Sequence, residues 1–472
     1  MEKVPEKYDY ISIGSGEAGR SVAWSLSANL GMKCVVVERS HITGSCPSVA
    51  CLPSKSFLHA AHTNHEYHSL FPSAHPASPN KLDMSIVKKR KDNMIYGPQG
   101  LVDLVQAGFD TKGTEIILGT GKFVGPKLIE VNGRLLTADY INISTGSRAF
   151  VDQSIPGLAE AAMTHIELLD IEVLPSHLII LGGGYIGTEF AQAFRRFGSE
   201  VTVVQRQEQI LPGQDKDMVD QLTGILQDEG VKVLTSTTIT AVTGTSGSTV
   251  TVELTSADGG KALGTIEGSH LLVATGRTPN TDNMGLELAG VKLTANGHVA
   301  VDEQLGTSAQ GVYASGDCAG SPHFTHIAYD DHRVIYSHIT GSPRPNGTLG
   351  RQVANVLFTS PELATVGLTE REAQAKGIPY RLVKAPMAHF LRARTLGPEA
   401  TRGLAKALIE EDGEKILGFT ILGPGAGELL PVVQLAMKLG ASYEEVKNLP
   451  IAHPSLSEDL AIALFSQVSS KK

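Results

Sequence analysis

Two copies of one unit, a strand followed by a glycine-rich loop, a helix and a second strand, constrain the fold of this chain most strongly. In the first copy, residues 10–13 read as a buried strand, a helical pattern follows, and residues 34–38 read as the second strand. Glu38 stands where an acid binds a ribose hydroxyl, and the loop lets the backbone approach a pyrophosphate at the helix N-terminus. The loop glycines are Gly14, Gly16 and Gly19. This unit predicts a Rossmann-like dinucleotide site.

The second copy begins with a strand at residues 178–181 and ends with one at residues 200–204, with a helix through Phe197 between them. Its loop glycines are Gly182, Gly184 and Gly187. The two loops stand about 170 residues apart, which fits two successive domains rather than a solenoid repeat. Two such units predict two bound nucleotides, and electron transfer between them is the economical explanation.

A pair of cysteines, Cys46 and Cys51, follows the first unit. Residues five apart in a regular helix have Cα atoms roughly 8–9 Å apart, whereas a disulfide tolerates only about 7 Å. If the two cysteines pair, the first turn of their helix must be distorted around them. The amide dipoles at a helix start also favour a thiolate. Beside a dinucleotide site this predicts a redox-active dithiol; two unrelated buried thiols, or half of a metal site, are the alternatives.

Composition limits the class of protein. The chain has 472 residues, 41% of them apolar, which suffices for about three or four domains. A net charge of −9 argues against nucleic acid as the main partner. Four cysteines in so long a chain exclude a secreted disulfide scaffold. The N-terminus shows no signal peptide and no apolar run reaches the length of a membrane span, so we expect a cytoplasmic protein without a membrane partner.

Turn-forming residues mark the organisation between these units. A loop rich in proline and serine at residues 70–80 is expected to separate two helices. Turns at residues 244–248 and 257–260 flank an alternating strand at residues 249–254, which predicts a meander at the end of the second nucleotide domain. A linker at residues 340–347 marks the start of a C-terminal domain.

Five further motifs stand in a characteristic order along the chain. They are residues 144–147 (Ser-Thr-Gly-Ser), 274–280 (Ala-Thr-Gly-Arg-Thr-Pro-Asn), 313–317 (Tyr-Ala-Ser-Gly-Asp), 358–362 (Phe-Thr-Ser-Pro-Glu) and 453–458 (His-Pro-Ser-Leu-Ser-Glu). Together with the glycine loops and the cysteine pair, this order resembles the flavoprotein disulfide reductases over nearly the whole chain. The similarity is to the branch that includes mercuric reductase and dihydrolipoamide dehydrogenase.

The resemblance implies an α/β fold with two Rossmann-like dinucleotide-binding domains and a C-terminal α+β dimerisation domain. The implied FAD-binding domain comprises residues 1–150 and 271–345, the NAD(P)-binding domain residues 151–270, and the dimerisation domain residues 346–472. The implied cofactors are FAD and NADP, or NAD. The implied enzyme is an NAD(P)H-dependent disulfide reductase that passes electrons through FAD and a redox disulfide to a small-molecule disulfide.

The resemblance also implies roles for residues around the dithiol. Cys51 is the thiol stacked near the flavin, and Cys46 is the thiol that attacks the substrate. Lys55 follows Cys51 by one helical turn, where its ammonium favours a thiolate and reduced flavin. Glu189 matches the acidic partner of that lysine, and Tyr185 matches the aromatic residue that covers the nicotinamide pocket. A surface ion pair and core packing are the alternatives for these residues.

His453 and Glu458 match an acid–base pair. A thiolate leaving group needs a proton near neutral pH, which imidazole is suited to supply, and a carboxylate can fix the imidazole tautomer. The resemblance implies that this pair reaches the disulfide of the other subunit, so that a homodimer shares its active sites. A solvated, helix-capping His and Glu are the alternative.

The remaining cofactor contacts follow from the same resemblance. Asp317 is implied on the ribityl-phosphate side of the flavin. Gln205 stands where NAD-selective relatives carry an acid, and Arg206 follows it, which predicts NADPH over NADH. Pro212 stands where some NADPH relatives carry a second arginine. The expected nucleotide-binding residues are Gly14, Gly16, Gly19, Glu38, Lys55, Thr145, Gly146, Gly182, Gly184, Tyr185, Gly187, Gln205, Arg206, Gly276, Arg277 and Asp317.

Four histidines recur at every third position after the dithiol. They are His59, His62, His65 and His68. Adjacent pairs are helix neighbours with ligand types that suit Zn or Cu, but a solvated or interface face is the favoured interpretation, and no metal site is expected. Cys34 and Cys318 read as buried structural thiols.

Two other functions remain open. Residues 401–403 and 423–429 look like mercuric reductase, which favours metal-ion reduction. Against it, residues 469–472 end the chain without that enzyme's terminal cysteine pair, and no N-terminal metal-carrier domain is seen. The other alternative is a flavin-binding redox sensor without turnover. The intact thiols, lysine and His–Glu pair argue against that alternative.

Overall fold

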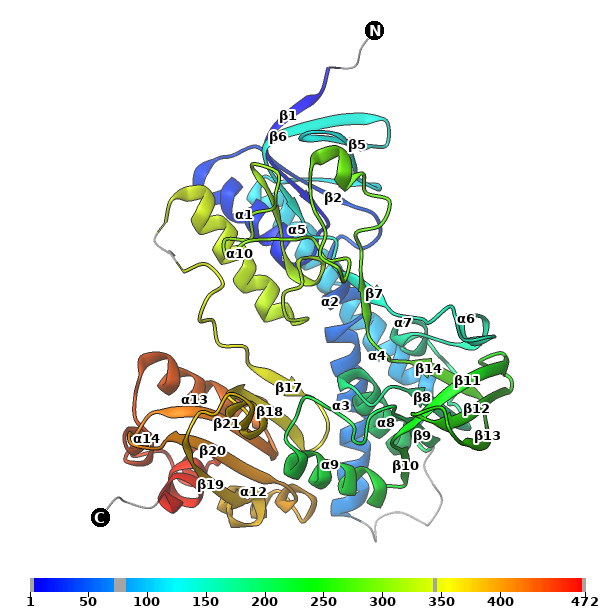
Figure 1. The fold of residues 1–472 in the computed structure, drawn as a ribbon, viewed down its shortest axis with the longest axis vertical. Helices are drawn as coiled ribbons and strands as arrows, with labels where there is room; N and C mark the ends of the chain where they lie inside the picture. The colour runs from blue at the N-terminus through cyan, green and yellow to red at the C-terminus, as the bar shows by residue number, and fades with distance from the viewer. Residues whose placement is uncertain (1–3, 72–81, 343–345, 469–472) are drawn as a thin grey trace. The chain divides into compact units, whose positions relative to one another are not determined.

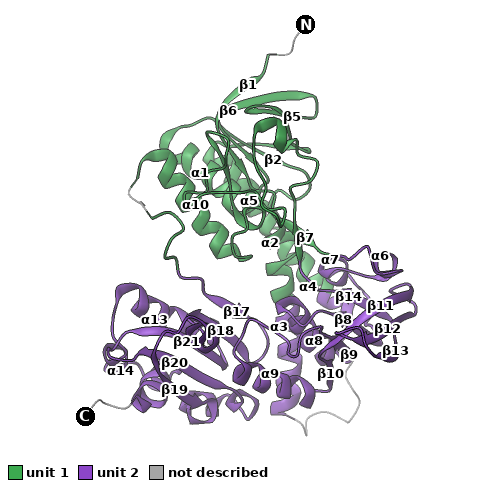
Figure 2. Cartoon of the chain, viewed as in Figure 1, with its two compact units in different colours: residues 1–56, 88–150, 277–351 green, residues 57–87, 151–276, 352–472 purple. Residues whose placement is uncertain are grey.

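The computed structural model describes residues 4–71, 82–342 and 346–468. Two compact units divide the chain (Figure 2): one holds residues 1–56, 88–150 and 277–351, and the other holds residues 57–87, 151–276 and 352–472. Most of the loop expected at residues 70–80, and part of the linker expected at 340–347, lie outside the described residues. The four-part domain division expected from the sequence stays a prediction.

The first unit is built on a sheet with the strand order β3-β2-β1-β6-β5-β4, in which β16 also pairs with β6. The first copy of the repeated unit, β1 and β2, is parallel, while β5 runs antiparallel to β4 and β6. The strands are β1 (Glu6–Ile13), β2 (Cys34–Glu38), β3 (Glu115–Leu118), β4 (Lys122–Gly125), β5 (Leu128–Val131), β6 (Arg134–Ile143) and β16 (Val312–Ala314), with a separate ribbon of β7 (Ser147–Ala149) and β15 (Arg277–Pro279).

Both faces of this sheet are covered, which explains the continuous apolar sequence of β2. Cys34 and Val36 belong to one core, which helices α1, α5 and α10 cover (Figure 1), and Val35 and Val37 belong to another. Side chains along a strand alternate between the two faces of a sheet, so these cores lie on opposite faces. Cys34 and Cys318 are buried, as expected. The helices of this unit are α1 (Glu17–Leu30), α2 (Ser45–Ser48), α5 (Leu101–Lys112), η2 (Leu286–Ala289), η3 (Gly316–Ala319) and α10 (Thr325–Thr340), while α3 (Cys51–Leu70) and α4 (Met84–Tyr96) contribute to both units.

The second copy of the repeated unit lies in the second unit, in a parallel sheet of order β10-β9-β8-β14. An antiparallel meander of β11, β12 and β13 follows β10, which confirms the expected turns and strand. The elements are α6 (Leu158–Ala161), α7 (His165–Leu168), β8 (His177–Leu181), α8 (Tyr185–Phe197), β9 (Glu200–Val204), α9 (Lys216–Asp228), β10 (Val231–Leu234), β11 (Thr237–Gly244), β12 (Val250–Ser256), β13 (Ala262–Gly268) and β14 (His270–Val273).

An aromatic stripe on α8 holds this part together. Phe190, Phe194 and Phe197 recur at helical spacing, and their rings lie 6.0, 5.3 and 4.9 Å from the ring of Phe57 on α3. Spacings of three and four residues put these side chains on one face of the helix. Leu178 of β8 belongs to the same buried core. This packing fixes β8 and α8, the strand and the helix that flank the second glycine loop.

A five-stranded antiparallel sheet of order β17-β18-β21-β20-β19 forms the C-terminal part of the second unit. The helix α13 packs on this sheet, and the α/β fold with a C-terminal α+β part is confirmed. No described helix is both long and apolar enough to cross a membrane. The elements are β17 (Asn355–Leu357), β18 (Glu362–Gly367), α11 (Glu370–Ala375), β19 (Tyr380–Pro386), η4 (Met387–His389), α12 (Leu391–Thr395), η5 (Glu399–Thr401), β20 (Leu404–Glu410), β21 (Ile416–Gly423), α13 (Ala426–Leu439), α14 (Tyr443–Lys447), α15 (Leu456–Asp459), η6 (Leu460–Leu464) and η7 (Phe465–Gln467).

Candidate active site

The loop glycines allow close backbone packing at the starts of α1 and α8. A Cβ at Gly14, where φ is +105°, would lie 2.2 Å from the carbonyl oxygen of Ser144, and a Cβ at Gly187 would lie 1.9 Å from that of Gly182. A Cβ at Gly184 would meet nothing within 4 Å, and neither helix start carries a side-chain cap. Both helix starts therefore lack a side-chain partner for their first N–H groups, and at Gly184 the space in front of α8 is open, as binding of a pyrophosphate requires.

Glu38 closes the first loop at the end of β2. One oxygen of its carboxylate, Oε2, accepts hydrogen bonds of 2.9 Å from the backbone N–H and the hydroxyl of Ser15. The other oxygen, Oε1, accepts a hydrogen bond of 2.8 Å from the N–H of Ser40. The expected ribose-binding acid thus lies beside the expected pyrophosphate loop.

The segment that carries the cysteines begins against this first loop. Gly44 has a φ of +71°, and a Cβ there would lie 2.8 Å from the Cα of Gly16. The guanidinium of Arg20, on α1, donates a hydrogen bond of 2.6 Å to the carbonyl of Thr43. A side chain at position 44 would push the two backbones apart, so a glycine there keeps the dithiol segment next to the loop.

Cys46 and Cys51 lie on different helices. Cys46 belongs to the single turn of α2, Val49 leaves the helical conformation with a φ of −136°, and α3 begins at Cys51. This break agrees with the expectation that the helix start is distorted around the pair. The four cysteines of the chain, all within the described ranges, are free thiols, and a hydrogen bond joins Cys46 to Cys51.

The surroundings of the pair favour one thiolate over the other. The hydrogen bond from Cys46 lowers the pKa of Cys51, an effect that burial opposes and that the Thr325 hydroxyl and the Lys55 ammonium reinforce. The same hydrogen bond, together with burial, raises the pKa of Cys46. The hydroxyl oxygen of Thr325 lies 3.4 Å from the sulfur of Cys51. In the reduced pair, these effects favour the thiolate on Cys51 and the proton on Cys46.

Three of the sequence motifs meet around Asp317. Its carboxylate accepts a hydrogen bond from the Ser147 hydroxyl and lies 3.5 Å from Nε of Arg277. Arg277 in turn donates 2.6 and 2.8 Å hydrogen bonds to the hydroxyl and the carbonyl of Ser147. Thr145 donates a 2.7 Å hydrogen bond to the carbonyl of Asn280, whose N–H donates to Gly146. Ser147, which links Asp317 to Arg277, belongs to the motif of residues 144–147 but is not among the nucleotide-binding residues expected from the sequence.

The second glycine loop is supported from behind by Gln205. Its side-chain oxygen accepts a 3.1 Å hydrogen bond from the N–H of Gly183, and its amide nitrogen donates to Gln207 and to the carbonyl of Gln209. Gln205 is buried, so its side chain shapes the loop, and a direct nucleotide contact by Gln205 stays a prediction. Gly276 has a φ of +140°, which favours glycine there.

Tyr185 stands at the start of α8, beside this loop. Its hydroxyl accepts a 3.0 Å hydrogen bond from Gln214, and burial raises its pKa. The hydrogen bond from Gln214 and packing against the buried core fix the position of this ring. Its expected role as a cover over the nicotinamide pocket stays a prediction.

A cavity of about 740 Å³ lies just after β9, in the second unit. Arg206, which directly follows Gln205, lines it together with Gln207 and Ser236. Arg371, from α11 in the C-terminal part, also lines this cavity. Sequence reasoning found Arg206 but missed Arg371, because no local motif connects α11 to the second glycine loop.

The other expected catalytic residues are divided between the two units: Lys55 lies in the first, and Glu189, His453 and Glu458 lie in the second. Nδ1 of His453 lies 2.8 Å from Oε2 of Glu458, so the expected pair is formed. Glu189 is buried, and its carboxylate accepts a 2.9 Å hydrogen bond from the N–H of Phe358. A pairing of Lys55 with Glu189 stays a prediction.

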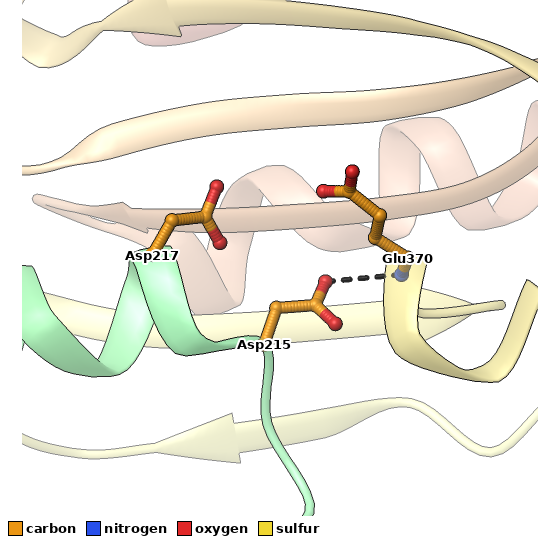
Figure 3. A group of neighbouring side chains, drawn as sticks. All are labelled: Asp215, Asp217 and Glu370. Atoms are coloured by element: carbon orange, nitrogen blue, oxygen red, sulfur yellow. Dashed lines mark hydrogen bonds between the residues drawn. The ribbon is translucent and has the colours of Figure 1, made fainter. Parts of the chain in front are cut away.

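A cluster of acids in the second unit is neutralised by a buried lysine. The carboxylates of Asp215, Asp217 and Glu370 lie within 4.8 Å of one another, on α11 and at the start of α9 (Figure 3). Nζ of Lys406, which is fully buried, lies 2.7, 2.7 and 3.2 Å from their oxygens. An ammonium group therefore occupies the position that a metal ion would need, and the cluster is an ion network.

The histidine run does not present one uniform face. His62 Nε2 lies 3.1 Å from the carbonyl oxygen of Phe358, and Arg196 donates a 2.8 Å hydrogen bond to His62 Nδ1. Burial lowers the pKa of His62 to about 4, so its ring is neutral near pH 7. The interpretation of a solvated or interface face fits His59, which is exposed, whereas His62 is only partly exposed and is hydrogen-bonded within the chain, so a solvated face does not describe it.

Comparisons with known proteins agree with this arrangement. The family described as pyridine nucleotide-disulphide oxidoreductase matches residues 8–331, and its dimerisation domain matches residues 353–464. A dihydrolipoyl dehydrogenase of Thermus scotoductus is 35% identical over 96% of both chains. A mercuric reductase of Bacillus cereus is 32% identical over 97% of this chain and 71% of its own. The solved structure of RclA, an HOCl-induced flavoprotein disulfide reductase from Escherichia coli, matches with a TM-score of 0.86 and 30% identity, over 98% of this chain and 100% of that chain.

Proposed function

The chain belongs to the pyridine nucleotide-disulphide oxidoreductases, and from this premise we propose which residues, which nucleotide and which kind of disulfide its reaction uses. It is a FAD-dependent enzyme that oxidises NAD(P)H and reduces a disulfide, and its dimerisation domain supports a homodimer. The proposed substrate is a small-molecule disulfide, and the proposed reductant is NADPH. We also propose a cytoplasmic location, since a disulfide that is reduced again in each turnover suits a reducing compartment.

One observation carries this proposal: a dithiol with one stabilised thiolate is attached directly to a dinucleotide loop. Gly44 places the dithiol segment against Gly16, and the neighbouring Cys46 lowers the pKa of Cys51. A structural cysteine pair has no need of such an asymmetry, because only a thiolate attacks a disulfide or transfers charge to a neighbouring acceptor. Bound FAD would relay an electron pair from the nicotinamide to this pair.

The proposed reaction has two half-reactions: NADPH first reduces the Cys46–Cys51 disulfide, and the resulting dithiol then reduces the substrate disulfide. A hydride equivalent from NADPH breaks the Cys46–Cys51 bond and leaves a thiol on Cys46 and a thiolate on Cys51. Cys46, on losing its proton to His453, attacks one sulfur of the substrate and breaks the substrate's disulfide bond. Cys51 then attacks Cys46 in the mixed disulfide and re-forms the Cys46–Cys51 bond. NADPH, one proton and one disulfide become NADP⁺ and two thiols.

We assign the proton transfers to His453. The carboxylate of Glu458 accepts a hydrogen bond from Nδ1 of His453, so Nε2 is the nitrogen left to exchange a proton with the reacting sulfurs. His453 would take the proton of Cys46 and give it to the departing thiolate, which otherwise leaves as an anion. We propose that the pair serves the dithiol of the partner subunit, which makes each active site a product of both subunits.

The test is an anaerobic titration followed by steady-state assays. We expect the purified holoenzyme to take up two electrons from NADPH beyond those of its flavin and to expose two titratable thiols. The expected turnover is NADPH oxidation dependent on a small linear or cyclic disulfide, abolished in Cys46→Ser. Full disulfide turnover by Cys46→Ser, or no extra thiols after reduction, would contradict the proposal.

Metal-ion reduction is the second candidate, supported by the likeness to mercuric reductase. Two adjacent thiolates would bind a soft metal ion. An acid–base imidazole has no task in that reaction, because no thiol leaves, and His453 with Glu458 therefore favours disulfide reduction. NADPH oxidation with Hg²⁺ that exceeds the rate with every disulfide, and that His453→Ala leaves unchanged, would favour the metal instead.

A further inference from the structure

We propose that Arg371 is a second specificity-determining residue, which binds the 2′-phosphate of NADPH together with Arg206. This inference rests on the NADPH preference proposed above and adds a residue from the C-terminal part of the chain to the nucleotide site. Arg371 lines the same cavity as Arg206, although it lies on α11, beyond β18.

The position of the cavity identifies its ligand. It lies at the end of β9, the second strand of the second glycine-loop unit, and in such units the residues after this strand meet the adenosine ribose. Its volume of about 740 Å³ admits a phosphate on that ribose. Ser236 and Gln207 add polar groups to the lining, as an anion with several acceptor oxygens requires.

The charges around the cavity show why Arg206 alone is insufficient. Glu208 and Asp258 also line the cavity, so two carboxylates stand against the single guanidinium of Arg206. Hydrogen bonds from Ser256 and from the N–H of Gly260 lower the pKa of Asp258, which is therefore ionised near pH 7. A phosphate would be repelled by that balance. The guanidinium of Arg371 restores neutrality before the phosphate binds.

Arg371 is held in place by the segment of residues 212–215, which follows β9. Its guanidinium donates a hydrogen bond to the carbonyl of Pro212, which also lines the cavity. Its backbone N–H donates 2.9 Å to Oδ1 of Asp215, and that of Glu370 donates 3.0 Å to Oδ2, the contact drawn in Figure 3. Asp215 is buried against Lys406 at 2.7 Å. The start of α11 is therefore anchored to the segment that follows β9.

This anchoring makes Arg371 a preorganised binding residue. An arginine offers several N–H donors in a fixed plane, and the carbonyl of Pro212 takes one of them. A guanidinium already fixed by one hydrogen bond loses less conformational freedom when it binds a phosphate. Arg371 is exposed, so its replacement leaves the buried core intact.

The test compares two nucleotide fragments and two dinucleotides on the holoenzyme. We expect Arg371→Ala to weaken binding of 2′,5′-ADP by about tenfold in calorimetry and to leave binding of 5′-AMP unchanged, since one charge-assisted hydrogen-bonding group is lost. The rate of flavin reduction by NADPH should fall similarly in kcat/KM, while that by NADH is preserved. Arg371→Lys keeps the positive charge but loses the planar guanidinium, so its affinity for 2′,5′-ADP should lie between those of the parent enzyme and Arg371→Ala. Lys376→Ala, which removes a charge from the end of the same helix, is the matched control.

The outcomes separate this inference from the proposed function. If the parent enzyme binds 2′,5′-ADP more tightly than 5′-AMP and Arg371→Ala keeps that ratio, Arg371 has no role and the NADPH preference stands. If the parent enzyme binds the two fragments equally, the NADPH preference and the role of Arg371 both fail. Disulfide turnover of the parent enzyme is measured separately and decides neither point.

Discussion

Nδ1 of His453 lies 2.8 Å from Oε2 of Glu458, and this contact determines what the imidazole can do. The carboxylate accepts a hydrogen bond from Nδ1–H, so the lone pair of the neutral ring is on Nε2. The His453 side chain is 64% exposed, whereas that of Glu458 is only 19% exposed. Glu458 is thus the fixed member of the pair, and His453 offers its second nitrogen outward.

We expect His453→Ala to slow disulfide turnover by roughly two to four orders of magnitude, the usual effect of losing a general acid. Flavin reduction by NADPH, measured in a stopped-flow instrument, should stay intact because that half-reaction needs no proton from His453. Glu458→Gln should have a smaller effect, since it removes the orienting charge and keeps the imidazole. His389→Ala, at an exposed histidine of the same unit, serves as the control. Unchanged disulfide turnover in His453→Ala would refute the assignment.

The thiol roles predict a spectroscopic difference between two serine variants. After reduction by two electrons, a thiolate at Cys51 beside oxidised flavin should give a long-wavelength absorption band. Cys51→Ser should abolish this band, whereas Cys46→Ser, which has no disulfide to reduce, should show it before any reduction and should lack disulfide turnover. Cys34→Ser, which alters a buried thiol elsewhere in the first unit, should leave both the band and the turnover unchanged. The opposite pattern in the first two variants would reverse the roles.

The same band should report the pKa of Cys51. The hydrogen bond from Cys46 lowers that pKa, so the thiolate persists below the value of about 8.5 that a free thiol shows. We expect the band at pH 7 and its loss as the pH falls through the lowered pKa. Lys55→Met removes a nearby ammonium and should move the midpoint upward. A midpoint at or above that of a free thiol would contradict the stabilisation of Cys51.

Features of the site could be predicted from the sequence where the interacting residues are close together along the chain. The glycine loops, β1, β2 and the break between Cys46 and Cys51 are recorded in neighbouring residues, and all were anticipated. Thr325 and Arg371 have no such local signal, since each meets its site only through tertiary packing. A sequence motif predicts the conformation of neighbouring residues, but it does not show which distant residues tertiary packing brings into contact with them.

Gln205 illustrates a second limit. Its position after β9 predicts a nucleotide contact, which stays untested, and in the structure its side-chain oxygen also accepts a hydrogen bond from the N–H of Gly183. A side chain at the end of a strand can face the ligand or support the loop, and the choice depends on the surrounding packing. The neighbouring Arg206 lines the cavity instead. The prediction of NADPH depends on the absence of an acid at Gln205 and on the guanidinium of Arg206.

We expect Arg206→Ala to lower kcat/KM for NADPH by about ten- to a hundredfold, the range of a hydrogen-bonding partner of a charged group. The value for NADH should change little, since NADH has only a hydroxyl at the 2′ position. Raising the salt concentration should weaken NADPH binding in the parent more than in the variant, because the lost contact is between exposed charges. Lys232→Ala, an exposed charge outside the cavity, is the control. An unchanged NADPH-to-NADH ratio in Arg206→Ala would refute this role.

The ion network around Lys406 should contribute strongly to stability. Three carboxylates surround its fully buried ammonium, and Lys406→Met would leave those of Asp215 and Asp217 to repel each other. Removing one partner of a buried ion pair costs about 3–5 kcal/mol, measured here as a shift of the urea unfolding midpoint. Lys384→Met is the matched control, because this lysine also contacts Asp217 at 2.7 Å but is 37% exposed. An exposed pair contributes about 1 kcal/mol or less. Equal destabilisation by the two variants would show that burial does not decide the strength of this network.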